Sequence, residues 1–305
     1  MLRVYKKGGV KGSLNDIGKV FTWIDIITPS TSDFKEISNK TPIKLNDLKE
    51  FYNPNEKPKI IKNNKYSIII FKTISSDKSD NSNYIQPIAI YLLNNCIVTV
   101  RKTDGYFSEL KDSVHNKNQF VYHFLDLCTA IYFDEFDKMQ EKINNIESEI
   151  LKSPNKKIVN KIFEIKKKLV ITHKALTSNR DVIASLQREE KLFDSNFNKQ
   201  LELIYYDLAQ LIETTDTYTE ILSASLEMYT SSISNNLNTI MKTLTILTAA
   251  FMFPTLIAAI YGMNFLHTPE FQWKYGYAWA WGLMIFSVII LILYFKKKGW
   301  MKDEF

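Results

Sequence analysis

The side chains with the clearest chemistry form one row in the C-terminal third of the sequence. They are polar, small or sulfur-containing, and each follows the previous one by three or four residues. On an α-helix this spacing places them close to one line along the axis. Such a line of carboxylate, hydroxyl, amide and thioether groups is suited to contact with a cation or its water. The row comprises Glu227, Ser231, Ser234, Asn238, Met241, Thr245, Thr248, Met252 and Thr255.

Beyond the row, a turn with the sequence Tyr-Gly-Met-Asn separates two apolar segments. The Asn264 amide and the carbonyls around Gly262 are neutral oxygen donors, which suit a hard cation such as Mg²⁺ that sheds its water reluctantly. A ring of these donors would hold Mg²⁺ with its waters attached, as a selectivity filter, and glycine permits the turn. The apolar segments hold no carboxylate and no His or Cys cluster, which argues against a dehydrated zinc site. His267 is interpreted as an exposed, inert loop residue.

The two apolar segments predict a transmembrane hairpin. Residues 244–261 and 277–295 contain no Asp, Glu, Lys, Arg or His, and a bilayer core of roughly 30 Å requires about 20 apolar residues in helical form. Lysine-rich flanks stay in the cytoplasm, so both termini are predicted to be cytoplasmic, with an external loop at 262–276. This places the protein in the cell membrane. The flanking lysines are Lys242, Lys296, Lys297 and Lys298.

A single hairpin cannot enclose a polar row, because hydroxyl and amide groups in lipid face protein or water. The row therefore predicts a homo-oligomer with a central pore lined by the first span. In the alternative interpretation, the threonines bond back to their own helix carbonyls and asparagine only sets the register of a bundle. The continuity of the row through the span favours the pore.

The first 103 residues are expected to form a small α/β domain with a mixed sheet. Short helices are predicted at 30–38, capped by Ser30 or Thr31, and at 45–52. A polar surface loop is predicted at 75–84. Strands are predicted from β-branched runs at 19–27, 66–74, 85–93 and 96–102.

Long helices are expected after this domain. No glycine lies between Gly105 and Gly262, and Pro154 is the only proline before Pro254 in that stretch, whereas both residue types break helices. The segment 104–195 is predicted to hold an antiparallel pair of charged helices, over 135–151 and 158–193.

A further helix is predicted from about residue 196 to 261. Its apolar positions run from Leu201 to Ile240, with an interruption at Thr215, and lead into the first span, where Pro254 is expected to kink the helix without ending it. At 1.5 Å per residue this helix would be about 100 Å long. Since the bilayer accommodates only about 30 Å, the remainder is predicted to project into the cytoplasm as a stalk.

Composition narrows the class of protein. The chain of 305 residues has a net charge of +6, enough length for one soluble domain and the hairpin, and no feature that requires nucleic acid. Cys96 and Cys128 are predicted to be free thiols on the reducing side, and the N-terminus lacks the apolar core of a signal peptide. The sequence contains no phosphate-binding loop, no nucleophile constellation and no pair of carboxylates in a plausible pocket, so an enzyme is disfavoured.

The turn and its surroundings resemble a known family. Tyr-Gly-Met-Asn-Phe at 261–265, at the end of the first of two C-terminal spans, resembles the signature of CorA-type magnesium transporters. The loop "HTPEF" at 267–271 is similar to that family's Met-Pro-Glu-Leu loop, with Thr268 and Phe271 as departures. The basic tail at 296–305 and the segments "TWIDI" (22–26) and "IVTVR" (97–101) are also similar.

The resemblance implies a homopentameric funnel: an α/β cytoplasmic domain, a long α-helical stalk and a two-helix transmembrane hairpin. It implies passive Mg²⁺ uptake without ATP, with Co²⁺ and Ni²⁺ also passed. Glu270 would lie in the external loop, and Glu227 would form an acidic ring at the cytoplasmic end. The implied selectivity filter consists of Gly262, Met263 and Asn264. Asn264 and Asn238 would contact Mg²⁺ through water. Thr255 would form a hydroxyl ring, and a hydrophobic constriction would be formed by Met241, Leu244 and Met252.

Two features of the family do not transfer simply to this sequence. In the family, the channel closes when intracellular Mg²⁺ binds between subunits, and one ligand is an Asp on the stalk. In this sequence, an ungapped count places Leu203 at the position of that Asp. Asp207, Glu213 or Asp216 could substitute as regulatory ligands. The lysine collar at 296–298 has no assigned role, because positive charge near a pore exit repels cations. Two alternatives remain open at this point: a Zn²⁺ or proton-coupled divalent carrier of the same fold, and a non-conducting, membrane-tethered helical scaffold.

Overall fold

The computed structural model describes residues 1–300 except 51–52, 54–55, 76–83, 103–106, 108–109, 112–113, 115, 153, 190–194 and 265–268. The chain divides into two compact units, Met1–Leu226 and Glu227–Phe305. Most of the predicted loop at 75–84, the last residues of the helix predicted over 158–193, His267, Thr268 and the tail beyond residue 300 lie outside the described residues.

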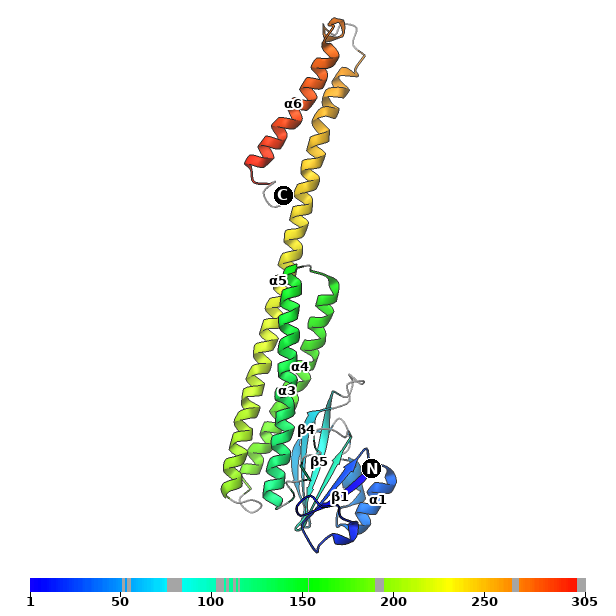
Figure 1. Cartoon of the computed structure of the whole chain (residues 1–305), viewed down its shortest axis with the longest axis vertical. Helices are drawn as coiled ribbons and strands as arrows, with labels where there is room; N and C mark the ends of the chain where they lie inside the picture. Colours follow the sequence, from blue (N-terminus) through cyan, green and yellow to red (C-terminus); the bar gives the residue numbers. More distant parts are fainter. Residues whose placement is uncertain are drawn as a thin grey trace. The chain divides into compact units, whose positions relative to one another are not determined.

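The first unit is built on a six-stranded mixed sheet in the order β1-β2-β6-β5-β4-β3 (Figure 1). Strands β2 and β6 are parallel, and the other neighbouring pairs are antiparallel. The predicted mixed sheet is confirmed, but the edge strands β1 and β3 were not predicted, because they are short and mostly half-buried. The strands are β1 (Leu2–Lys6), β2 (Thr22–Ile27), β3 (Lys59–Lys62), β4 (Ser67–Ile74), β5 (Ile85–Leu92) and β6 (Cys96–Arg101).

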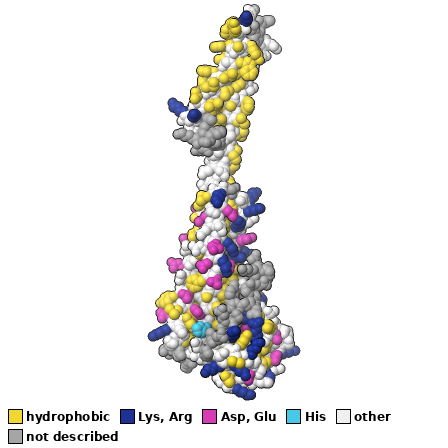
Figure 2. Space-filling model, in the orientation of Figure 1, with side chains coloured by type: hydrophobic (Ala, Val, Ile, Leu, Met, Phe, Trp, Pro, Cys, Tyr) yellow, Lys and Arg dark blue, Asp and Glu magenta, His cyan; other side chains and the backbone are white. Residues whose placement is uncertain are grey.

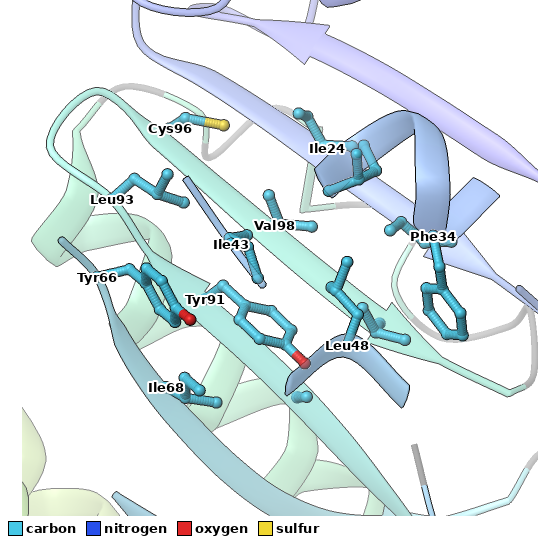
Figure 3. Packing of buried hydrophobic residues seen from close by; sticks show 14 of the residues in the cluster. Ile24, Phe34, Ile43, Leu48, Tyr66, Ile68, Tyr91, Leu93, Cys96 and Val98 are labelled. Carbon is cyan, nitrogen blue, oxygen red and sulfur yellow. The ribbon is translucent and has the colours of Figure 1, made fainter. Parts of the chain in front are cut away.

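Two short helices cover one face of the sheet, α1 (Thr31–Lys40) and α2 (Leu45–Glu50). The predicted cap of α1 is present: the Ser30 hydroxyl accepts from the Asp33 N–H, and the Asp33 carboxylate accepts from the Ser30 N–H, which lowers the pKa of Asp33. Figure 3 shows side chains of the sheet packed with those of the two helices. This cluster includes Ile24, Tyr91, Val98, Phe34 and Leu48.

Helices α3 (Lys117–Lys152) and α4 (Lys156–Gln187) pack on the sheet through contacts with β3, β4 and β5. Glu149 and Lys161 form an ion pair at 2.7 Å near the turn, whereas Tyr132 and Asn179 meet at one carbonyl farther from it, so the helices are antiparallel as predicted (Figure 1). The start predicted for the first helix, residue 135, was wrong. The helix begins at Lys117 because its first turns are apolar and aromatic, and they are buried rather than charged.

Helix α5 (Ser195–Tyr261) is continuous through Pro254, as predicted. Its first half completes a three-helix bundle: Tyr218 stacks on Phe136 of α3, and Ser223 accepts a 2.8 Å hydrogen bond from Lys166 of α4. Thr215, which interrupts the apolar row in the sequence, is only 1% exposed. Its hydroxyl donates to the Leu211 carbonyl, so the buried row is continuous in the structure. The sequence did not predict this packing of the stalk.

One side chain of α4 takes the place of a strand. The Asn179 amide accepts from the Lys72 N–H at 2.9 Å and donates to the Lys72 carbonyl at 2.7 Å, while Tyr132 donates to the same carbonyl. Strand β3 pairs with β4 only as far as Ile70, so Lys72 lies beyond the last residue of β4 that β3 covers. Asn179 therefore satisfies the backbone at a gap in the sheet.

A buried ion pair joins the parallel strands β2 and β6. Arg101 donates to Asp25 through Nη2 at 2.7 Å and through Nε at 3.0 Å, and Thr99 donates to the same carboxylate at 2.8 Å. Trp23 donates its indole N–H to the Thr99 hydroxyl. Asp25 and Arg101 are 1% and 2% exposed, so the pair is desolvated but well supplied with hydrogen bonds.

The second unit contains the hairpin of α5 and α6 (Gly276–Lys297), with a short 3₁₀ helix, η4 (Pro269–Gln272), before α6. Both helices have an apolar window long enough to span a membrane, and only 0% and 6% of the two windows are buried. A core helix of a soluble protein would instead be covered. Figure 2 shows apolar side chains spread over the surface of this hairpin.

We expect Asn179→Ala to lower the free energy of unfolding by about 1–3 kcal/mol, because it leaves the partly buried Lys72 N–H without its partner. Chemical unfolding of the purified full chain in detergent measures this change. Ser178→Ala is the matched control, since this exposed hydroxyl bonds only to its own helix at Lys174. Equal stability of the two variants would contradict the role given to Asn179.

Candidate ion pathway

The polar row predicted from the sequence lies on one exposed line of α5. All of its members, from Glu227 to Thr255, are exposed in the single chain, and so is Leu244. Positions partly covered within the hairpin unit, such as Ile246, Ala250 and Ile257, lie on another side of the helix. Helix α6 therefore leaves the row open, and the row is available to a pore or to another protein surface.

The threonines in the row are satisfied within their own helix. Thr245, Thr248 and Thr255 donate their hydroxyl protons to the carbonyls four residues earlier, at 2.7–2.8 Å. This is the back-bonded geometry of the alternative interpretation. It leaves the outward side of each hydroxyl oxygen with lone pairs only. A hydrated cation presents water hydrogens outward, so these oxygens can accept from its water shell.

The predicted filter follows directly after α5. Gly262, Met263 and Asn264 are all exposed, and the Gly262 N–H donates to the Ala258 carbonyl at 2.9 Å. Gly262 does not adopt a left-handed conformation. A Cβ there would lie 3.3 Å from the Ala258 oxygen, a tight contact with the last helical turn.

Gly276 fixes the packing of η4 against α6, a role that the sequence analysis missed. A Cβ at Gly276 would lie 2.2 Å from the Glu270 carbonyl oxygen, a distance that atoms cannot adopt. Only glycine therefore allows η4 to rest on the first turn of α6. The close approach positions the backbone of Glu270, whose residue is partly buried.

Aromatic side chains mark both ends of α6. Trp273 contacts Tyr275 and Trp279 at the first end, with ring centroids 6.2 Å apart in both pairs. Tyr294 and Trp300 lie at the other end, beside Lys298. Trp and Tyr gather at the two interfaces of a bilayer, so this distribution fits a membrane-spanning α6.

The candidate regulatory carboxylates do not converge. Asp207 and Asp216 are nine residues apart on α5, on opposite sides of the helix. Glu213 is exposed, and Asp216 is exposed and lies 3.5 Å from His173. Among the described residues, no group of three or more His, Cys, Asp and Glu side chains is arranged to hold a metal.

Asp207 has an acidic neighbour that the sequence analysis missed, Asp126 of α3. Burial raises the pKa of both carboxyls; at Asp126, His123 opposes this rise, and the negative charge of Asp207 adds to it. The two residues are far apart in the sequence, so no local pattern links them. Leu203, which the ungapped count assigns to the stalk position, is 59% exposed.

Comparisons with known proteins agree over most of the chain. The model of the CorA-like Mg²⁺ transporter protein family matches residues 18–297. The cobalt/magnesium transport protein CorA of Thermotoga maritima is 30% identical over 295 residues, which are 92% of this chain and 83% of that protein. The protein of the same name from Methanocaldococcus jannaschii is 28% identical over 293 residues, 92% of this chain and 91% of that protein.

A solved structure extends the agreement to the fold. The complete structure of the CorA magnesium transporter from Methanocaldococcus jannaschii superposes with a TM-score of 0.86 at 25% identity, and the match covers 99% of both chains. The α/β unit, the long helix and the C-terminal hairpin are thus common to both. Together with the family match, this shows that the chain belongs to the CorA-like Mg²⁺ transporter family of membrane proteins, which transport divalent cations.

Proposed function

We propose that the chain forms a passive divalent-cation channel for Mg²⁺ uptake, which also passes Co²⁺ and Ni²⁺. In this proposal five copies surround a central pore in the cell membrane, and both termini of each chain are cytoplasmic. The observation that carries the proposal is the exposed polar row on α5, which runs without interruption from Glu227 to Thr255 and leads to Asn264. The names of the two relatives, cobalt/magnesium transport proteins, support the choice of ions.

The ion would pass with its water shell. Asn264 accepts from that shell at the mouth, with Glu270 adding negative charge in the external loop. Asn238 makes water-mediated contact near the cytoplasmic end, and the Glu227 ring attracts cations there. Between these ends, the threonine oxygens are acceptors, and the large apolar side chains gate by excluding water. These constricting side chains are Met241, Leu244 and Met252.

The membrane potential is a sufficient driving force. A charge that crosses a potential of 100 mV gains about 2.3 kcal/mol, so a divalent ion gains about 4.6 kcal/mol. This corresponds to a concentration ratio of roughly 2,000. Uptake of Mg²⁺ through an open pore therefore needs neither ATP nor a coupled ion.

The alternatives fit the observations less well. A Zn²⁺ or proton-coupled carrier requires soft ligands or a titratable group in the membrane, and residues 244–261 and 277–295 contain neither Cys, His nor a carboxylate. A non-conducting scaffold is compatible with the back-bonded threonines. The scaffold hypothesis gives no reason why the threonines align with the Gly262–Asn264 turn. The experiments below distinguish the scaffold from the channel.

Asn264→Ala is expected to abolish most Mg²⁺ uptake into liposomes that contain the purified protein, because the filter loses its amide oxygen. Sizing of the variant should show an intact oligomer. Asn236→Ala is the matched control, since Asn236 is exposed on α5 but off the polar row. Equal uptake by wild type and Asn264→Ala would remove Asn264 from the mechanism, and absence of uptake in the wild type would favour the scaffold.

Thr248→Val tests the row itself. The substitution keeps the shape of the side chain and removes its acceptor oxygen, so we expect Mg²⁺ uptake to fall several-fold. Thr243→Val loses an equivalent bond, from the Thr243 hydroxyl to the Thr239 carbonyl, but lies off the row. Its uptake should remain near that of the wild type. The same rate in both variants would indicate that the row does not face the ion.

We further propose that Asp207, with Asp126, is the regulatory Mg²⁺ site of this chain. Glu213 and Asp216 are weaker candidates because they are exposed on other sides of α5. Two partly buried carboxylates repel each other at neutral pH, and a divalent cation would relieve this repulsion. Leu203 offers no ligand. Because Asp126 and Asp207 belong to the same chain, the proposed site would lie within one subunit.

Asp207→Asn should raise the melting temperature at pH 7.5 by about 2–4 °C, and Mg²⁺ should do the same in the wild type only. The pKa of both carboxyls is raised by folding. The folded state is therefore destabilised as pH rises through the unfolded pKa and on to the folded pKa. The gain from Asp207→Asn should vanish toward pH 4. Glu213→Gln serves as the control, and an equal Mg²⁺ response of wild type and Asp207→Asn would contradict the assignment.

A further inference from the structure

A groove with a volume of about 400 Å³ lies between α3 and α4 in the first unit. Pockets of this size hold small organic molecules. Its described lining residues come from α3, over 135–149, and from α4, over 161–168. Phe136 and Lys166, which contact α5, are not among these lining residues, so the groove is separate from the packing of α5.

The groove has an apolar floor and a charged rim. Met139, Ile146 and Ile165 are only 1%, 2% and 7% exposed, and they form the floor. The other described lining residues are three lysines, three glutamates, an asparagine and a serine. A simple inorganic ion makes no use of an apolar floor. The lining is therefore suited to a ligand that combines an apolar body with charged or polar groups.

Two lysines face each other across the groove. The ion pair of Glu149 with Lys161 sets the register of the antiparallel helices. Lys142 lies seven residues before Glu149, and Lys168 lies seven residues after Lys161. Seven residues are close to two turns of an α-helix, so Lys142 and Lys168 occupy the next equivalent positions on the facing walls. Opposite charges meet at the first level, whereas two positive charges meet at the second.

The two lysines have no protein counter-ion. Among the described residues, no carboxylate lies within ion-pair distance of Lys142 or Lys168. The Lys168 ammonium instead lies 5.0 Å from the centroid of the Tyr84 ring. Such a contact holds the cation in place without neutralising it. Lys168 is half-buried beside the groove, so an anion placed between the two lysines would relieve their repulsion.

The carboxylates of the groove are mostly engaged elsewhere. Glu149 pairs with Lys161 at 2.7 Å, and Glu135 lies 3.8 Å from Lys138 on its own helix. Only Glu164 is without such a partner among the described residues that line the groove. The level of the two unpaired lysines thus carries an excess of positive charge, which is suited to a phosphate group.

Polar groups for a sugar or a base follow one turn farther along the groove. Asn145 comes three residues after Lys142, and Glu164 comes four residues before Lys168. The Ser148 hydroxyl donates to the Asn145 carbonyl, and its oxygen keeps its lone pairs as acceptors. An aliphatic anion would leave these amide, carboxylate and hydroxyl groups unused. The hydroxyls and ring nitrogens of a nucleoside would match them.

We propose that this groove binds a nucleotide. Its phosphate lies between Lys142 and Lys168, and its base rests on the floor at Ile146 and Ile165. Asn145 and Glu164 form hydrogen bonds with the sugar or the base. The groove shares no residue with the polar row of α5, which begins at Glu227 in the second unit, so a bound nucleotide leaves the proposed ion pathway free.

The test is isothermal titration calorimetry of the purified full chain in detergent, in buffer without Mg²⁺. The probes are adenosine monophosphate, adenosine and inorganic phosphate. We expect adenosine monophosphate to bind at one site per chain. Adenosine lacks the group for the lysines, and phosphate lacks the group for the floor, so each should bind about tenfold more weakly or worse.

Lys142→Gln and Lys168→Gln should each weaken the binding of adenosine monophosphate about tenfold, the effect of one charge-assisted hydrogen bond. Lys167→Gln removes an equal charge from an exposed position of α4 that is not among the described lining residues, and its affinity should equal that of the wild type. Melting temperatures close to that of the wild type would show that the variants are folded.

Three outcomes would overturn the proposal. Absence of binding by the wild type would remove the site, and unchanged affinity in Lys142→Gln and Lys168→Gln would place the nucleotide elsewhere. Phosphate that binds as tightly as adenosine monophosphate would assign the groove to simple anions. The measurement involves no ion flux, so its outcome is independent of the proposed channel function.

Discussion

Hydrocarbon offers no hydrogen-bond partner, and this constraint governs how the hairpin of this protein is built. Within the apolar part of α5, every threonine hydroxyl of the polar row is bonded to its own helix. Because these hydroxyls are bonded within the helix, the row can be polar without destabilising the span. This bonding also means that the hydroxyls alone do not require other copies of the chain. Their alignment, and the exposed Asn264 at the end of the row, are the features that favour a pore.

Helix α5 meets two different environments along its length, and its sequence changes accordingly. As far as Leu222, its buried row, which includes Thr215, is covered by α3 and α4. From Glu227 onward, the polar row is exposed and no element of the described chain covers it. The helix has no break between the two parts. Helix α5 therefore contributes residues both to the packing of the first unit and to the candidate ion pathway of the second.

Much of this architecture could be predicted from the sequence, because its signals are local or periodic. The apolar spans, the four central strands, the capped α1 and the row on α5 are read from neighbouring residues. Edge strands β1 and β3 are too short and too exposed to give such a signal. The start of α3 was misjudged because its aromatic residues fill the space against the sheet instead of forming a charged face. The clamp of Asn179 on Lys72 and the approach of Asp126 to Asp207 join distant segments, and only the fold brings them together. The turn at Gly262–Asn264, the proposed filter, was recognised by its motif, whereas the need for Gly276 follows from a steric contact that no motif encodes.

The buried pair of Asp25 and Arg101 has a consequence for how this sheet can diverge. Both residues lie within the two N-terminal segments that resemble the family, 22–26 and 97–101. Loss of one partner would leave a buried charge without compensation, at a cost of about 3–5 kcal/mol. That amount is comparable to the whole stability of many domains, about 5–15 kcal/mol. Replacing the pair by apolar residues would cost far less, but it requires two simultaneous changes. A chain with only one of the two changes would be strongly destabilised, which hinders the replacement of the pair. The pair can therefore persist while the surrounding sequence changes, even if it has no part in ion transport.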